Sequence, residues 1–266
     1  MKSAPVVLVI ATAAVLSGAT ARLKLSTTTS TQASGILETL IPAFERTCHC
    51  HVDVIAVGTG KALKLGESGD VDVVLVHARA LEDQFVAAGF GVNRRDVMYN
   101  DFVIIGPAND PAHIGDAKTA SDAFTRIAAA QGPFISRGDE SGTHQKEKEL
   151  WKAAGLNPQG RWYRSVGQGM GETIIMATEV QGYTLTDRAT YAAFKQGRTD
   201  LKILFEGEAG LFNPYGVIAV NPRKFPWVRF DLATMFIDFL SGAEGQRLIA
   251  GYRVAGEPVF FVYGRK

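Results

Sequence analysis

Hydrophobic and polar residues follow two patterns along this chain, one typical of strands and one typical of amphipathic helices. Residues 52–57 and 71–76 are short β-branched runs of strand length, while the apolar residues of segment 36–44 recur at helical spacing. Because strands and helices alternate from residue 23 onward, the pattern predicts an α/β fold with mainly parallel sheets flanked by helices. The predicted strands are 23–26, 52–57, 71–76, 102–105, 133–136, 183–185, 202–205 and 216–220.

Two predicted strands run into helices through segments that are rich in Ser, Thr and Gly. Residues 26–31 read STTTST and include Thr28, Thr29 and Ser30, and residues 58–61 read GTGK and include Thr59. A helix N-terminus has unpaired N–H groups and a positive dipole end, so hydroxyls and amides there can surround an anion. N-capping alone needs one hydroxyl, not six. The second segment is not a nucleotide P-loop, because Ala follows its Lys.

A third segment, residues 137–144 with the sequence RGDESGTH, combines charge with donors. Arg137 offers a fixed fork of N–H groups, and Ser141, Gly142 and Thr143 begin a predicted helix. The competing interpretation is a secreted hydrolase that uses Ser141 as its nucleophile. This segment lacks the G-x-S-x-G spacing, and no paired base or metal triad is visible, so we expect no enzyme.

The fourth segment, residues 165–173 with the sequence SVGQGMGET, precedes another predicted helix and includes Gly171, Glu172 and Thr173. By itself this glycine string is weak evidence, and it gains value from the other three segments. The sequence leaves open whether Asp139 or Glu172 faces the anion. We expect both, together with Glu140, to point away and to pair with lysines or cap backbone N–H groups.

The run Cys48-His49-Cys50-His51 contains both cysteines of the chain. One residue apart, they are poorly placed to bridge each other, and alternating Cys and His rarely reach the tetrahedral angles of a soft-metal site. An exposed helix end is the simpler interpretation, so we predict no metal and no cofactor. His77, at the end of an apolar strand, is expected to be structural.

Composition and the first residues indicate the compartment. Lys2, an apolar run over residues 5–16 and the closing Ala19-Thr20-Ala21 predict a secretory signal peptide over residues 1–21, cleaved after Ala21 into the periplasm or the medium. The run is shorter than a membrane span needs. With 28 basic and 27 acidic residues, the charge is nearly balanced, which gives nucleic acid nothing to bind. An anion site must therefore be local, and we expect a monomer.

No linker divides the chain, but two strand ends with Pro-containing turns, residues 101–107 and 213–222, could let the chain enter a second lobe and return. With all these segments in view, the sequence resembles the TupA family of tungstate-binding proteins of ABC importers. The similar segments are TTTST at 27–31, VGTGKAL at 57–63, DVVLVHA at 72–78, GVNRRDVMYND at 91–101, RGDESGTH at 137–144, GQGMG at 167–171 and YTLTDR at 183–188.

The resemblance implies a type II periplasmic-binding-protein fold, in which two α/β lobes joined by two crossing strands close over the ligand. The lobes are then expected at residues 22–103 with 217–266, and at residues 104–216. The resemblance also implies that the first three segments bind tungstate, with a contribution from the fourth, and that the partners are the permease subunits of an ABC transporter. Molybdate, phosphate and sulfate remain open as alternative ligands on the same fold. Tungstate and molybdate are the hardest to tell apart, because they share charge and shape.

Overall fold

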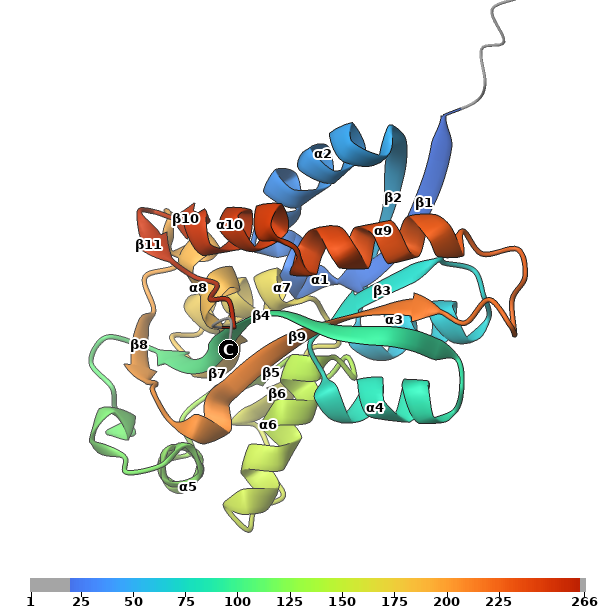
Figure 1. The fold of residues 1–266 in the computed structure, drawn as a ribbon. Helices are drawn as coiled ribbons and strands as arrows, with labels where there is room; N and C mark the ends of the chain where they lie inside the picture. The colour runs from blue at the N-terminus through green and yellow to red at the C-terminus, as the bar shows by residue number, and fades with distance from the viewer. Residues whose placement is uncertain (1–19, 264–266) are drawn as a thin grey trace, which may run out of the picture.

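The structure is a computed structural model that describes residues 20–263, and Figure 1 shows its arrangement. The helices are α1 (Thr29–Ala33), α2 (Ile36–Cys48), α3 (Thr59–Glu67), α4 (Arg79–Ala87), η1 (Ile114–Asp116), α5 (Ala120–Ala130), α6 (Gly142–Ala153), α7 (Met170–Glu179), α8 (Arg188–Lys195), η2 (Ala209–Leu211), α9 (Phe230–Ser241) and α10 (Ala243–Gly251). The strands are β1 (Ala21–Thr28), β2 (Cys50–Val57), β3 (Val73–Val76), β4 (Gly91–Gly106), β5 (Phe134–Ser136), β6 (Tyr163–Ser165), β7 (Thr184–Asp187), β8 (Lys202–Phe205), β9 (Phe212–Val220), β10 (Arg253–Val254) and β11 (Glu257–Pro258).

The central sheet has the strand order β2-β1-β3-β9-β4-β7, and β8 also pairs with β4. The predicted α/β class is confirmed, and each predicted strand overlaps an observed one. The sheet is mixed, however, rather than mainly parallel. β1 runs parallel to β2 and β3, but the long strands β4 and β9 pair antiparallel with each other and with their other neighbours. The hydrophobic pattern predicted only residues 102–105 of β4, because the first part of this strand has polar, half-exposed residues.

Four hydrophobic clusters form the core. Apart from Ala189, two of them are built from residues 23–98 together with 215–260, and the other two from residues 102–211. β4 and β9 run side by side between the two groups (Figure 1). Core side chains thus separate along the chain near the two strand ends that the sequence singled out, while the lobe boundaries themselves stay a prediction.

The cysteine run corrects one prediction. Helix α2 ends at Cys48, and His49 takes up a left-handed conformation with φ of 51°, so the chain reverses at once into β2. This reversal brings the Cα atoms of Cys48 and Cys50 within 5.1 Å, and the two residues form a disulfide. The prediction that they are poorly placed to bridge is therefore wrong.

The predicted signal peptide lies outside the described residues up to position 19. Ala21 begins β1 and pairs with Cys50, so Arg22, the predicted first residue after cleavage, is already part of the sheet. Within residues 20–263, no helix has the length and apolarity to cross a membrane.

Candidate functional site

The first two hydroxyl-rich segments emerge side by side at one edge of the sheet. β1 and β2 are parallel, and their register pairs Thr28 with Val57, so both strands end at the same level. Helix α1 begins directly after β1 and helix α3 after β2, which places two helix N-termini at the carboxyl ends of neighbouring strands. In open α/β sheets this is where ligands bind.

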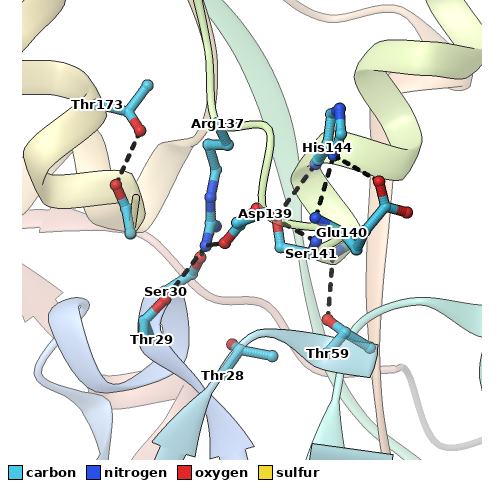
Figure 2. A network of polar contacts seen from close by, with 12 residues as sticks. Thr28, Thr29, Ser30, Thr59, Arg137, Asp139, Glu140, Ser141, His144 and Thr173 are labelled. Carbon is cyan, nitrogen blue, oxygen red and sulfur yellow. Dashed lines mark hydrogen bonds and ion pairs between the residues drawn. The ribbon is translucent and has the colours of Figure 1, made fainter. Parts of the chain in front are cut away.

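Arg137 approaches the same edge of the sheet from a different part of the chain. It follows β5, and its side chain is only 1 % exposed. Its Nη1 donates to the Ser30 hydroxyl at 2.9 Å and its Nη2 to the Thr29 hydroxyl at 3.2 Å (Figure 2). A buried guanidinium costs several kcal/mol unless it is paired and hydrogen-bonded, so its position across these hydroxyls is specific.

The third segment also meets the second. The amide of Gly142, the first residue of α6, donates to the Thr59 hydroxyl at 3.1 Å. A methyl group added to Gly142 would lie 3.0 Å from the carbonyl oxygen of His77, so a larger residue here would push the two segments apart. A methyl group added to Gly58 would likewise lie 3.3 Å from the carbonyl oxygen of Asp139. The structure therefore brings residues of segments 26–31, 58–61 and 137–144 together, as the sequence predicted.

Four hydroxyls in this site accept a hydrogen bond and keep their own hydrogen to donate. Thr29 and Ser30 accept from Arg137, Thr59 accepts from Gly142, and Ser141 accepts from the amide of His144 at 3.2 Å. Two further donors, Arg137 Nε and Thr143 Oγ1, are buried and have no hydrogen-bond partner among the described residues. Several O–H and N–H groups are thus available for one acceptor, which is what a fully ionised oxyanion requires.

Other predicted residues have different surroundings. The buried Thr28 hydroxyl is already engaged by Thr31 and His77, and the Thr173 hydroxyl donates to the carbonyl of Gly169 at 2.8 Å. Gly171 is buried where a methyl group would meet the Phe194 ring at 2.5 Å. Its amide lies in the first turn of α7, whose N-cap Gly169 provides no side-chain cap. Thr28 and Thr173 are therefore weaker candidates for ligand donors than Thr29, Ser30 and Thr59.

The three acidic residues next to the proposed donors have different surroundings. Glu140 pairs with Lys148 at 2.9 Å, and this hydrogen bond lowers the pKa of the Glu140 carboxyl, as expected of a residue that points away. Glu172 is exposed, and its carboxylate lies against Gly169 at the start of α7. For Asp139 the expectation that the carboxylate points away is wrong, because it accepts from Arg137; it does cap a backbone amide, that of Ser141, at 3.2 Å (Figure 2). The two-residue spacing lets this side chain fold back onto the guanidinium.

Ser141 caps helix α6, and His144 lies in the first turn of the same helix. Nδ1 of His144 accepts from the Glu140 amide at 3.1 Å, and burial lowers the pKa of this imidazole. No group of three or more Cys, His, Asp or Glu side chains that could hold a metal ion occurs in the described part of the chain.

The site thus combines a buried arginine with helix N-termini at one edge of a mixed sheet. This arrangement is that of an anion-binding protein. The model of the PBP superfamily domain matches residues 14–244, and the chain belongs to that superfamily. Tungstate-binding protein TupA from Peptoclostridium acidaminophilum is 45 % identical over 240 residues, which cover 89 % of this chain and 84 % of that protein. The chain thus belongs, more narrowly, to the TupA family.

Two solved structures agree with this assignment. The tungstate ABC transporter structure from Geobacter sulfurreducens is 64 % identical in sequence, with a TM-score of 0.81, and the match covers 87 % of this chain and 98 % of that one. The tungstate-binding protein TupA from Desulfovibrio alaskensis G20 is 46 % identical, with a TM-score of 0.75, and the match covers 91 % and 98 %.

Proposed function

We propose that this protein is the extracytoplasmic solute-binding component of an ABC transporter, and that it captures tungstate and delivers it to the permease. The observation that carries the proposal is the buried guanidinium of Arg137, which meets the hydroxyls of Thr29 and Ser30 at a helix N-terminus. The names of the similar proteins support tungstate as the ligand. The protein acts by binding and performs no catalysis, and no cofactor takes part.

Closure of two lobes on the oxyanion is part of the proposal. The lobes are residues 22–103 with 217–266, and residues 104–216, and β4 and β9 connect them. Arg137 and Gly142 belong to the second lobe, while their partners Thr29, Ser30 and Thr59 belong to the first. Each of these hydrogen bonds is therefore made only when the lobes approach.

The energetics are sufficient for tight binding. A hydrogen bond to a charged group contributes about 1.5–3 kcal/mol, and burial of an ion costs several kcal/mol. A nanomolar site needs about 12 kcal/mol, which seven or eight converging donors can provide after desolvation and closure. The proposed donors are the side chains of Thr29, Ser30, Thr59, Arg137, Ser141 and Thr143, and the amides of Gly171 and Glu172. The amides of Gly142 and Thr173 already donate to the Thr59 hydroxyl and to the Gly169 carbonyl.

Export by a signal peptide cleaved after Ala21 places the mature protein, a monomer, in the periplasm or the medium. The N-terminal sequence of the secreted protein tests this directly. A first residue of Arg22 supports the proposal, whereas retention of the first 21 residues on the mature protein contradicts it.

Titration calorimetry on the mature protein, residues 22–266, tests the ligand. Tungstate, molybdate, sulfate and phosphate are titrated in turn, and tungstate is expected to bind with a nanomolar dissociation constant and with the highest affinity. Tighter binding of another anion would transfer the proposal to that anion. No binding of any of the four, together with turnover in an esterase and phosphatase screen, would favour the hydrolase instead.

A further inference from the structure

His77 lies at the end of β3, beside the proposed site, and is only 3 % exposed. Its ring stacks on Tyr215 of β9, with 4.7 Å between ring centroids. Nδ1 lies 3.0 Å from Asn213 Oδ1, and Nε2 lies 3.2 Å from the hydroxyl of Thr28. Both ring nitrogens are thus engaged, one by a strand of the central sheet and the other by the turn that leads into α1.

The direction of each hydrogen bond follows from an acidic residue farther along the chain of contacts. Asp187 accepts from Asn100 Nδ2 at 3.4 Å, so Asn100 turns its Oδ1 toward Asn213 and accepts from Asn213 Nδ2 at 2.6 Å. Asn213 therefore presents its own Oδ1 to His77, and Nδ1 must carry the proton. In the neutral ring Nε2 is then an acceptor, to which the Thr28 hydroxyl donates.

The same carboxylate connects back to the turn. Asp187 Oδ1 accepts from the amide of Thr190 at 2.9 Å and caps helix α8, and the Thr190 hydroxyl donates to the carbonyl of Ser30 at 3.4 Å. At the other end Thr28 accepts from the Thr31 amide at 3.1 Å. These hydrogen bonds thus form a closed network of buried polar groups around residues 28–31, the turn whose hydroxyls face Arg137.

We propose that His77 is a positioning residue for the oxyanion site: its neutral, Nδ1-protonated tautomer holds Thr28 and thereby orients the hydroxyls of Thr29 and Ser30 toward the ligand. This inference rests on the proposed function only in its effect on affinity. The tautomer itself is a property of the protein without ligand.

The charges around the ring agree with a neutral imidazole. Burial lowers the pKa of His77, an effect that the carboxylate of Asp187 and the hydrogen bond with Asn213 oppose and that the guanidinium of Arg137 reinforces. A second proton on Nε2 would face the Thr28 oxygen, to which Thr31 already donates. Protonation would therefore reverse the hydrogen bond between Nε2 and the Thr28 hydroxyl, whose hydrogen would have to turn toward Thr31 Oγ1.

Two substitutions separate the two ring nitrogens. In His77→Asn the amide nitrogen replaces Nδ1 and keeps the bond to Asn213, while the bond to Thr28 is lost. In His77→Gln the amide oxygen replaces Nε2 and keeps the bond to Thr28. We expect tungstate affinity to fall about tenfold in His77→Asn, the equivalent of one hydrogen bond, and less than about threefold in His77→Gln. His51→Gln, an exposed histidine in β2, serves as the matched control.

Thr28→Val completes a double-mutant cycle. If His77 acts through Thr28, this substitution weakens binding about tenfold in the wild-type background and less than about twofold in His77→Asn. Independent, multiplying effects would overturn the proposal, and so would equal losses in the two His77 variants.

Nitrogen-15 NMR of the His77 ring in the ligand-free wild-type protein tests the tautomer without any variant. At pH 7.5 we expect a protonated Nδ1 and an unprotonated Nε2. The opposite tautomer, or a doubly protonated ring, would refute the inference even if tungstate binds as proposed. Conversely, the expected tautomer in a protein that does not bind tungstate would refute the proposed function but not the assignment of the His77 tautomer.

Discussion

Replacement of Arg137 by alanine removes the contact on which the proposed site depends. The guanidinium is buried and donates to Ser30, Thr29 and Asp139. Loss of two charge-assisted hydrogen bonds to a dianion, at about 1.5–3 kcal/mol each, lowers the binding free energy by at least about 3 kcal/mol. The dissociation constant for tungstate is therefore expected to rise at least about 100-fold.

Asp139 adds a second effect to the Arg137→Ala variant. Its side chain is 16 % exposed, and without Arg137 its carboxylate keeps the Ser141 amide as its hydrogen-bond donor and faces the site as an uncompensated charge. We expect the ligand-free variant to fold with a lower melting temperature than wild type. The double variant Arg137→Ala/Asp139→Asn should regain much of this stability and little of the affinity.

Asp139→Asn alone completes the cycle. It releases an Arg137 N–H group and removes a charge that repels the dianion, so tungstate should bind more tightly than to wild type. Calorimetry measures the four affinities, and thermal unfolding without ligand measures the four stabilities. An Arg137→Ala protein that unfolds like wild type and binds tungstate with unchanged affinity would refute the assignment of the site.

Three further predictions concern other parts of the molecule. Burial raises the pKa of Glu147 to about 7, so the native state holds a proton that the unfolded chain has released. The free energy of unfolding should therefore fall as pH rises from about 5 to 8. In Glu147→Gln the melting temperature should change less over that pH range than in wild type. Gly142→Ala should weaken tungstate binding about tenfold by wedging against His77, whereas Gly251→Ala, with open space around it, should not. Cys48→Ser/Cys50→Ser should cost about 1.5 kcal/mol of unfolding free energy and leave calorimetric affinity unchanged, because the closed loop is short and remote from Arg137.

Much of the architecture could be predicted from the sequence, because buried strands have simple patterns. The apolar runs at residues 71–76 and 102–105 fall within or overlap observed strands, and the stripe at residues 36–44 lies in α2. The direction of β4 and β9 could not be predicted, since antiparallel pairing of strands far apart in sequence depends on tertiary contacts. The disulfide escaped for a related reason: the left-handed conformation of His49 is set by the turn, not by residue type.

The site was predictable at the level of segments and not of individual hydroxyls. A cluster of Thr and Ser at a helix N-terminus indicates anion binding, but the sequence cannot say which hydroxyl is already engaged. Thr28 is engaged by Thr31 and His77, whereas Thr29 and Ser30 are turned toward Arg137. The position of Asp139 depends on the side-chain path of Arg137, which no spacing rule fixes.

The pairing of Arg137 with Asp139 changes how the site can attract a dianion. Because the carboxylate offsets the guanidinium charge, attraction must come mainly from dipoles, namely hydroxyls and the amides of helix N-termini. The hydrogen bonds from Arg137 to Ser30 and from Gly142 to Thr59 each use an oxygen lone pair and leave an O–H hydrogen for the ligand. In the proposed closure on the oxyanion these same bonds orient the hydroxyls that bind it, so affinity and lobe closure are expected to change together when either bond is removed.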